Sequence, residues 1–411
     1  MSPAHRVVVT GLGQVSALGT DVASFSDAVF AGRPSVRRLD GLGAPGVEDP
    51  IGASIVGFDP SAWLPPRAVP TTPRAAQYAL AAAAQAFTAA GLERTDRPRG
   101  GVFVGTGFGG IAESEETYRA CFTQPGQRPR PLAIPTAMAN AAAGLLASEL
   151  RLKGENLTLT VACSSATHAI GQAFRLLRAG GADLMLAGGT DAPLTPIVVA
   201  AWSAMRVLAP AGIDPNRACR PFSRDRQGIV LGEGAGFLVL ETLGHARGRG
   251  ARPLAEVVGY GANADAGHVT HPDLSGVKSC MALALADADL GPEAVGYVNA
   301  HGTGTAANDS TEARAIAELF GAHASRLLVS STKAVHGHAM GAAGALETVA
   351  TVLALATGQI PPTANFVEAD PDLPPLDFVP DGGRKAAIEV ALKSSFAFGG
   401  NNAVLALRRM G

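Results

Sequence analysis

The segment 158–177, TLTVACSSATHAIGQAFRLL, decides the fold of this chain, because a strand pattern gives way to a helix pattern inside it. Residues 157–162 form a short apolar run that predicts a strand, and residues 165–179 predict a helix. Cys163 lies between them, where unpaired backbone N–H groups and the positive end of the helix dipole favour a thiolate. Cys163 is therefore a candidate nucleophile, although an inert buried cysteine is the commoner occupant of such a position.

Strand-like and helix-like segments alternate along the rest of the chain, and this order predicts an α/β fold with helices covering mixed sheets. Residues 141–147 are small and apolar all round, which predicts part of a buried helix. Strands are predicted over 6–10, 101–105, 157–162, 184–187, 236–241, 255–260, 297–300, 327–330, 391–396 and 403–408. Helices are predicted over 74–90, 137–150, 165–179, 276–288, 310–320 and 342–356.

The two halves of the chain share a similar order of elements. Each half contains a strand that enters a Gly-rich turn and then a helix of small residues. Gly, Arg and Pro cluster over 246–253, which indicates a surface connection between the halves. We predict an N-terminal half over 1–250, which carries the cysteine, and a C-terminal half over 251–411.

Composition excludes several classes of protein. The chain has 411 residues, is 47% hydrophobic and 17% charged, and carries a net charge of −2, so it has a large core and no global field that favours nucleic acid. Its four cysteines are far apart, with neither zinc-ligand spacing nor a disulfide framework. The first residues lack the pattern of a signal peptide, and apolar runs such as 349–356 are too short to span a bilayer. A cytoplasmic protein without a membrane partner is expected.

Three further turns carry groups suited to catalysis. The segment 298–313, VNAHGTGTAANDSTEA, places His301 directly after a predicted strand and before a Gly-rich turn. The segment 330–347, SSTKAVHGHAMGAAGALE, gathers Lys333, His336 and His338 on a glycine-punctuated turn. In the segment 394–405, SSFAFGGNNAVL, two glycines free the backbone after Phe398. Each turn alone is a weak signal, because loop histidines are often only hydrogen-bonded, but the conjunction is specific.

Taken together, these turns resemble those of the β-ketoacyl-acyl-carrier-protein synthases, elongating condensing enzymes of the thiolase superfamily that serve type II fatty-acid and polyketide synthesis. The resemblance runs from VVVTGLGQVSALG (7–19) to FAFGGNNAVL (396–405), and it includes ACSSATHAIG (162–171) and GGTDA (188–192). It implies a thiolase-like fold of five layers, αβαβα, with two pseudo-symmetric halves. It also implies a dimer with the strand 157–162 near its interface.

The resemblance implies a decarboxylative Claisen condensation. Cys163 matches the cysteine that accepts the acyl chain as a thioester. His301 and His338 match the histidines that promote decarboxylation of the malonyl unit and stabilise the enolate oxygen. His336 is the local rival for the second role, and His338 is preferred because it occupies the GH position before AMGAAG. No metal or organic cofactor is implied, because both substrates arrive on the phosphopantetheine of an acyl carrier protein.

Supporting roles are implied for other positions. Lys333 matches the family lysine, and Glu347 matches the glutamate that pairs with it. Asp309 and Glu312 are expected to support the same site without contacting the substrate. For Glu347, an ordinary carboxylate on a helix surface is the alternative. The remaining matches are the oxyanion-hole N–H groups of Cys163 and Phe398, the gate Phe398, and the pantetheine-binding Thr303 and Thr305.

A carrier protein is acidic, so a basic patch is expected near the tunnel mouth. Arg67, Arg128, Arg130 and Arg206 are candidates for it by rough position, and ordinary solvated arginines are the alternative.

Two departures bear on the substrate. Phe108, in GTGFGG, stands where elongating synthases often have a smaller aliphatic residue near the bottom of the acyl pocket, so it could shorten that pocket or suit a flat unsaturated chain. A core phenylalanine that faces away is the alternative. The run AAND at 306–309 is more like polyketide-type ketosynthases than fatty-acid ones. We therefore favour a polyketide or polyene pathway.

Other members of the superfamily fit less well. Biosynthetic thiolases use a second catalytic cysteine late in the chain, whereas the last cysteine here is Cys280. Initiating synthases and chalcone-type enzymes pair Cys with His and Asn, whereas the third position here is His338. A non-catalytic chain-length factor lacks the nucleophile that this chain keeps. We expect an active subunit, in a homodimer or in a heterodimer with a chain-length-factor-like homologue.

Overall fold

A mixed sheet of ten strands runs through the molecule in the order β10-β9-β13-β14-β8-β1-β7-β6-β4-β5. The computed structural model describes residues 4–410. The ten strands are β1 Val7–Ser16, β4 Gly100–Gly105, β5 Asn156–Leu159, β6 Leu184–Asp191, β7 Gly234–Thr242, β8 Ala255–Ala264, β9 Val295–Asn299, β10 Leu328–Ser330, β13 Val390–Ala397 and β14 Asn401–Arg409. Two small ribbons, β2 Arg37–Arg38 with β3 Ile51–Gly52 and β11 Gln359–Ile360 with β12 Arg384–Lys385, lie outside it.

The two halves of this sheet repeat one pairing pattern. In the N-terminal half, β1 and β7 are antiparallel, β7 and β6 are antiparallel, and β6, β4 and β5 are parallel. In the C-terminal half, β8, β14, β13, β9 and β10 pair in the same sequence of directions. The halves meet where Val7–Val9 pairs antiparallel with residues 255–257. This is the pseudo-symmetry expected from the sequence.

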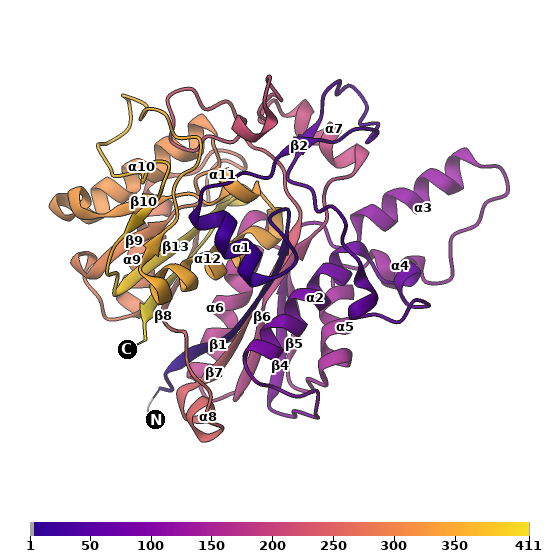
Figure 1. Cartoon of the computed structure of the whole chain (residues 1–411), viewed down its shortest axis with the longest axis horizontal. Coiled ribbons are helices and arrows are strands. Elements are labelled where there is room, and N and C mark those ends of the chain that lie inside the picture. Colours follow the sequence, from indigo (N-terminus) through magenta and orange to yellow (C-terminus); the bar gives the residue numbers. More distant parts are fainter. Residues whose placement is uncertain (1–3, 411) are drawn as a thin grey trace.

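Helices form three layers around the two half-sheets (Figure 1). α6 (Ser165–Arg178) and α12 (Ala343–Thr357) lie between the halves and contact strands of both. α2 (Arg74–Ala89) and α5 (Ala141–Leu150) cover the N-terminal half, and α9 (Leu274–Asp287) and α10 (Ala306–Phe320) cover the C-terminal half. The result is the αβαβα arrangement.

α12 is apolar for a reason that this layering explains. The segment Met340–Thr357 is long and apolar enough to cross a membrane by composition alone, but 83% of it is buried inside the molecule. A helix packed between two half-sheets has no solvent face, so apolar residues surround its axis. It is a core helix.

The structure corrects the sequence predictions at several helices. Residues 141–147 were expected to be wholly buried, but α5 buries only one face, with Ala142, Ala143, Leu146 and Leu150, and Gly144 is exposed. Six helices were not predicted: α1 Val22–Phe30, α3 Ile111–Thr123, α4 Ala133–Ala137, α7 Pro196–Ala204, α8 Leu243–Gly248 and α11 Lys333–His336. α3 and α4 form an arm that projects from the N-terminal half (Figure 1).

Candidate active site

Cys163 lies on a sharp turn between β5 and α6. A short 3-10 turn, Ala162–Ser164, separates the strand from the helix, and Ala162 adopts a left-handed backbone conformation with φ +49°. The Ser165 hydroxyl donates to Ala162 O at 2.6 Å and accepts from the Val161 N–H at 2.8 Å. These bonds hold a strained backbone, of the kind found at functional sites, and the turn presents the sulfur beyond the end of the strand.

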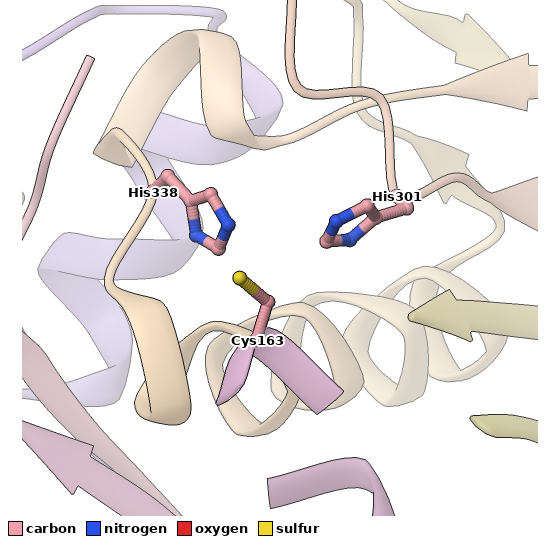
Figure 2. Close-up of side chains that lie close together, drawn as sticks. All are labelled: Cys163, His301 and His338. Atoms are coloured by element: carbon pink, nitrogen blue, oxygen red, sulfur yellow. The ribbon is translucent and has the colours of Figure 1, made fainter. Parts of the chain in front are cut away.

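Two imidazoles from the other half of the chain converge on this sulfur (Figure 2). His301 follows β9, and His338 follows α11. The ligand atoms of Cys163, His301 and His338 all lie within 4.8 Å of one another, and the three side chains are buried. The two rings stand edge to face, with centroids 5.5 Å apart. Cys163 and two histidines that lie more than a hundred positions further along the chain therefore form one compact cluster.

Hydrogen bonds assign the protons on the two rings. The Met340 N–H donates to His338 Nδ1 at 3.2 Å, and Lys333 Nζ lies 3.2 Å from His301 Nδ1. A ring nitrogen that accepts a hydrogen bond carries no proton, so each neutral ring carries its proton on Nε2. His338 Nε2 is buried and has no partner within residues 4–410. It is a free donor beside the sulfur.

Burial and charge keep both rings neutral. Burial lowers the pKa of His301 and of His338 well below the usual value, and the Lys333 ammonium lowers both further. Neutral imidazoles donate from Nε2 without adding charge to the site. The pair can stabilise a negative oxygen that develops between the rings.

The sulfur itself behaves differently from the expectation based on the helix dipole. Burial raises the pKa of the Cys163 thiol to about 12, and Lys333 only partly opposes this. Cys163 precedes the first residue of α6 by two positions, and it is surrounded by low-dielectric core. Desolvation therefore outweighs the dipole, and the resting group is a thiol.

Lys333 is held by three contacts. It donates to His301 O at 2.6 Å, lies beside His301 Nδ1 and forms an ion pair with Glu347. Glu347 is fully buried in α12, so the alternative of a helix-surface carboxylate is wrong. Lys333 thereby fixes the orientation of the His301 ring.

Asp309 and Glu312 shape the turn that carries His301. Glu312 accepts from the backbone N–H groups of His301 and Gly302 at 2.7 and 2.8 Å. Asp309 accepts from the N–H groups of Phe222 and Thr303 at 2.8 and 3.0 Å. Both carboxylates lie on the first turns of α10 and contact no substrate position themselves. They act on the site by holding the backbone.

A cavity of about 280 Å³ leads to the sulfur. Its wall includes Thr303 and Thr305, whose hydroxyl oxygens lie 2.9 Å apart. Thr305 also caps α10 by accepting from the Asn308 N–H at 3.4 Å. The other lining residues include the three residues of the cluster, Phe396, Phe398, Trp202 and the loop residues Val269, Thr270, His271 and Pro272.

His336 is excluded from this cavity. Its Nδ1 contacts Gly337 O at 2.8 Å, its Nε2 contacts Thr332 Oγ1 at 3.0 Å, and its ring stacks near Phe25. Both nitrogens are already occupied in the core. Of the two neighbouring histidines, only His338 lines the cavity.

Phe398 closes one side of the cavity. Its ring stacks on Trp202, with centroids 5.6 Å apart and an interplanar angle of 23°. The glycines that follow have φ of +82° and +69°, which suits a mobile loop, but hydrogen bonds hold them here. The Gly399 N–H donates to Val269 O at 2.7 Å, and Gly400 O accepts from the Asp265 N–H at 2.9 Å.

The remaining predicted residues are dispersed. Phe108 is half-buried in the apolar cluster that surrounds Cys163 and Trp202, but it does not line the cavity. The four arginines are exposed: Arg67, Arg128, Arg130 and Arg206. Arg130 pairs with Glu116 at 3.0 Å in a separate groove beside the α3–α4 arm. Arg206 directly follows Met205, which lines the cavity.

Sequence reasoning missed three residues that the site depends on. Asp191, at the end of β6, accepts from the Gly107, Phe108 and Gly341 N–H groups and so ties the turn after His338 to β4. Lys393 is buried behind the site. Trp202 packs on the gate. Asp191 stands inside the GGTDA motif, and a lysine within the predicted strand 391–396 was a visible signal.

Cysteine and histidine side chains at this spacing are also ligands that zinc accepts. A structural zinc site needs a fourth protein ligand, which this cluster does not contain within the described part of the chain. The expectation that the reaction requires no metal and no organic cofactor stays a prediction.

Comparison with known proteins agrees with this site. Residues 4–246 match the beta-ketoacyl synthase N-terminal domain, and residues 254–367 match the C-terminal domain. The chain is 42% identical over 410 residues to 3-oxoacyl-[acyl-carrier-protein] synthase 2 of Coxiella burnetii, covering 99% of each chain.

Two solved structures are similar over the full length. The ishigamide ketosynthase/chain length factor has a TM-score of 0.91 and 36% identity, covering 99% of this chain and 100% of that one. A type II polyketide acyl-carrier protein in complex with its ketosynthase has a TM-score of 0.90 and 31% identity, with the same coverage. This chain therefore belongs to the beta-ketoacyl synthase family, as an elongating condensing enzyme of fatty-acid or polyketide synthesis.

Proposed function

We propose that Cys163, His301 and His338 carry out the decarboxylative condensation of a Cys-bound acyl chain with malonyl-acyl-carrier protein. The observation that carries this proposal is the convergence of two Nε2 donors on one sulfur, with His338 Nε2 left unpaired. A buried donor without a partner is costly unless a ligand supplies the acceptor. The enolate oxygen of the malonyl unit is that acceptor.

In the first step, the sulfur of Cys163 attacks the carbonyl carbon of an acyl-pantetheine thioester. The new thioester forms on Cys163 as the bond to the pantetheine sulfur breaks. The proton lost by Cys163 ends on the departing pantetheine sulfur. The backbone N–H groups of Cys163 and Phe398 stabilise the oxyanion of the tetrahedral intermediate in this proposal.

In the second step, malonyl-carrier protein enters the same cavity. Its carboxylate leaves as CO2, and the electron pair of the broken bond forms an enolate whose oxygen accepts from the Nε2–H groups of His301 and His338. The enolate carbon then attacks the thioester carbon on Cys163. The cysteine sulfur leaves as a thiolate and takes a proton from solvent, which restores the resting thiol and releases β-ketoacyl-carrier protein. No metal or organic cofactor takes part in this scheme.

A carrier protein delivers both substrates. Thr303 and Thr305 lie on the cavity wall, where hydroxyl groups can bond the amides of a phosphopantetheine arm. Carrier proteins are acidic, so the exposed arginines Arg67, Arg128, Arg130 and Arg206 are the proposed docking residues. The solved complex of a carrier protein with its ketosynthase, which is similar to this chain, supports this type of partner.

A second ketosynthase-like subunit is the proposed dimer partner. β5 is the last strand of the sheet, so its outer edge pairs with no other strand among residues 4–410. Apolar side chains are exposed on β5 itself, with Leu157 at 44%, and on the projecting α3–α4 arm, with Ile134 at 73% and Phe122 at 86%. Exposed apolar side chains of this size are typical of association surfaces. The partner is a second copy or a chain-length-factor-like homologue, and a role as the non-catalytic subunit is the alternative.

The pathway is proposed on narrower grounds. Phe108 and Trp202 place aromatic rings in the cluster around Cys163, which suits a flat unsaturated acyl chain. We favour a polyketide or polyene pathway: the similarity to a type II polyketide ketosynthase supports it, although 3-oxoacyl-[acyl-carrier-protein] synthase 2 of Coxiella burnetii has the higher identity, 42%. The proposed location is the cytoplasm, without nucleic-acid or membrane partners.

The direct test is reconstitution. Purified protein, alone and with candidate chain-length-factor-like partners, is incubated with acyl-carrier protein and then with malonyl-carrier protein. An acyl adduct that maps to Cys163, followed by β-ketoacyl product, is the expected result, and C121A is the matched control that keeps the adduct. The absence of an adduct in every pairing would identify the inactive-subunit role instead.

A further inference from the structure

Lys393 is a second lysine buried behind the cluster of Cys163, His301 and His338. It is the only charged residue of β13 (VALKSSFA), and its side chain is fully buried. Buried lysines are rare and are usually paired, because removing an ammonium from water is costly. A lysine in this position requires a reason that packing does not supply.

Its ammonium has a complete set of partners drawn from three elements. Lys393 Nζ lies 2.8 Å from Glu347 Oε2 in α12, and it donates to Thr167 Oγ1 in α6 at 2.9 Å and to Ser395 Oγ in β13. Gly344 leaves room for it, because a Cβ there would lie 2.2 Å from Thr167 Oγ1 and 3.2 Å from Lys393 Nζ. The pocket is built around the ammonium.

Lys393 and Lys333 divide one carboxylate between them. Lys333 pairs with Glu347 Oε1, and Lys393 with Glu347 Oε2. With both lysines protonated, this trio carries one uncompensated positive charge. That charge lowers the pKa of His301 and of His338, and Lys393 contributes to both effects.

We propose that Lys393 is a positioning residue for the condensation: it fixes Glu347, leaves Lys333 to orient His301, and supplies the excess positive charge that keeps the imidazoles neutral. This inference rests on the proposed function of the three-residue cluster. The titratable groups that face Lys393 are Glu347, Lys333 and Glu312, together with the two imidazoles on which its field acts. In addition to burial, Glu347 raises the pKa of Cys163, so the ion pair between Lys393 and Glu347 should offset part of that effect at the sulfur.

The charge on Lys393 is sensitive to pH. Burial lowers the pKa of Lys393 to about 8, opposed mainly by Glu347. The charge is present below that pH and is lost above it. A role that depends on this charge therefore has a pH signature, whereas a packing role does not.

The experiment compares wild-type protein with K393M, K393R and the control K278M, whose lysine pairs with Glu318 in a surface ion pair. Alkylation of Cys163 by iodoacetamide is followed by peptide mass spectrometry from well below to well above pH 8. K393M is expected to react about tenfold more slowly at low pH, the change produced by one pKa unit. This deficit should shrink above pH 8, where wild type also loses the charge.

The alkylation rate of K393R should equal that of wild type below pH 8 and exceed it above pH 8, because arginine keeps its charge. The alkylation rate of K278M should equal that of wild type at every pH. A second readout is the pH dependence of the rate of malonyl decarboxylation. Loss of the Lys393 charge raises the pKa of both imidazoles, so in K393M the fall in rate at acid pH should begin at a higher pH. Alkylation needs no acyl substrate, so this test stands even if reconstitution fails for every starter.

The proposal would be overturned if folded K393M had the wild-type alkylation rate and an unshifted decarboxylation profile at acid pH. It would also be overturned if the alkylation deficit of K393M were the same at every pH. If K393M does not fold, K393Q takes its place. Failure of both to fold, with K393R folded, would assign the ammonium to stability and also overturn the proposal.

Discussion

The backbone N–H of Met340 donates to Nδ1 of His338, and this contact decides which ring nitrogen faces the sulfur. Met340 has φ +47°, a strained conformation for a residue other than glycine. The strain is held by the next residue, because the Gly341 N–H donates to Asp191 at 2.6 Å. A carboxylate on β6 thus indirectly sets the tautomer of a histidine on the opposite half of the chain.

Replacement of His338 tests this arrangement. H338A should reduce release of CO2 from malonyl-carrier protein by roughly two to three orders of magnitude, as the loss of one oxyanion donor does. H336Q is the matched control, and it should keep its decarboxylation rate per folded molecule because His336 does not line the cavity. Unchanged CO2 release in H338A would transfer the role to His336.

Removal of the nucleophile should separate the two steps. C163A should abolish acyl transfer but retain decarboxylation, because both imidazoles stay in place. Measurement of labelled CO2 and of the acyl adduct on the same samples tests this. Condensation that persists in C163A would refute the role of the sulfur.

Because Trp202 stacks on Phe398, the fluorescence of Trp202 should report movement of the Phe398 ring. The chain has two tryptophans, so W63F leaves Trp202 as its single indole. Acylation of Cys163 should displace the Phe398 ring and change the fluorescence of Trp202. The same additions to W63F/C163A should give no change, and a constant signal on full acylation of W63F would mean that Phe398 does not move.

Phe108 lies in the apolar cluster around Cys163 but outside the wall of the cavity, so it should limit acyl chains that extend into that cluster. F108A enlarges the apolar cluster next to Cys163, so longer acyl chains should be accepted and longer products should form, measured by mass spectrometry of carrier-bound products. F366A, a half-buried phenylalanine of the C-terminal core, is the control for general loosening. An unaltered length distribution would show that Phe108 faces away from the chain.

Carrier docking should depend on charge. R67E and R206E should raise KM for acyl-carrier protein several-fold at low salt, with little effect on an acyl-pantetheine substrate that lacks the protein. K278E, at a surface lysine of α9 that does not line the cavity and pairs with Glu318, should change neither value. Equal losses with both substrates would indicate damage to the cavity instead of the docking surface.

Local sequence largely determined the elements. Short apolar runs predicted all ten strands of the main sheet, to within a few residues at most ends, but not which strands pair or in which direction. The main exception was β1, which continues six residues past its predicted end through Gly11 and Gly13, where glycines allow α2 to approach closely. The helices α1, α3 and α7 lie outside the central layers and gave no comparable signal.

Local residue patterns were enough to identify the reactive groups: a thiol at a strand–helix junction, and a lysine and histidines on glycine-rich turns. Which of these groups act together, and in what state of protonation, became clear only from the folded chain. Burial keeps Cys163 a thiol although the helix dipole favours a thiolate. Packing also gives both nitrogens of His336 hydrogen-bond partners, and it places Lys393 in an ion pair with Glu347. Desolvation and hydrogen-bond geometry depend on packing between the two halves, and no local pattern encodes that packing.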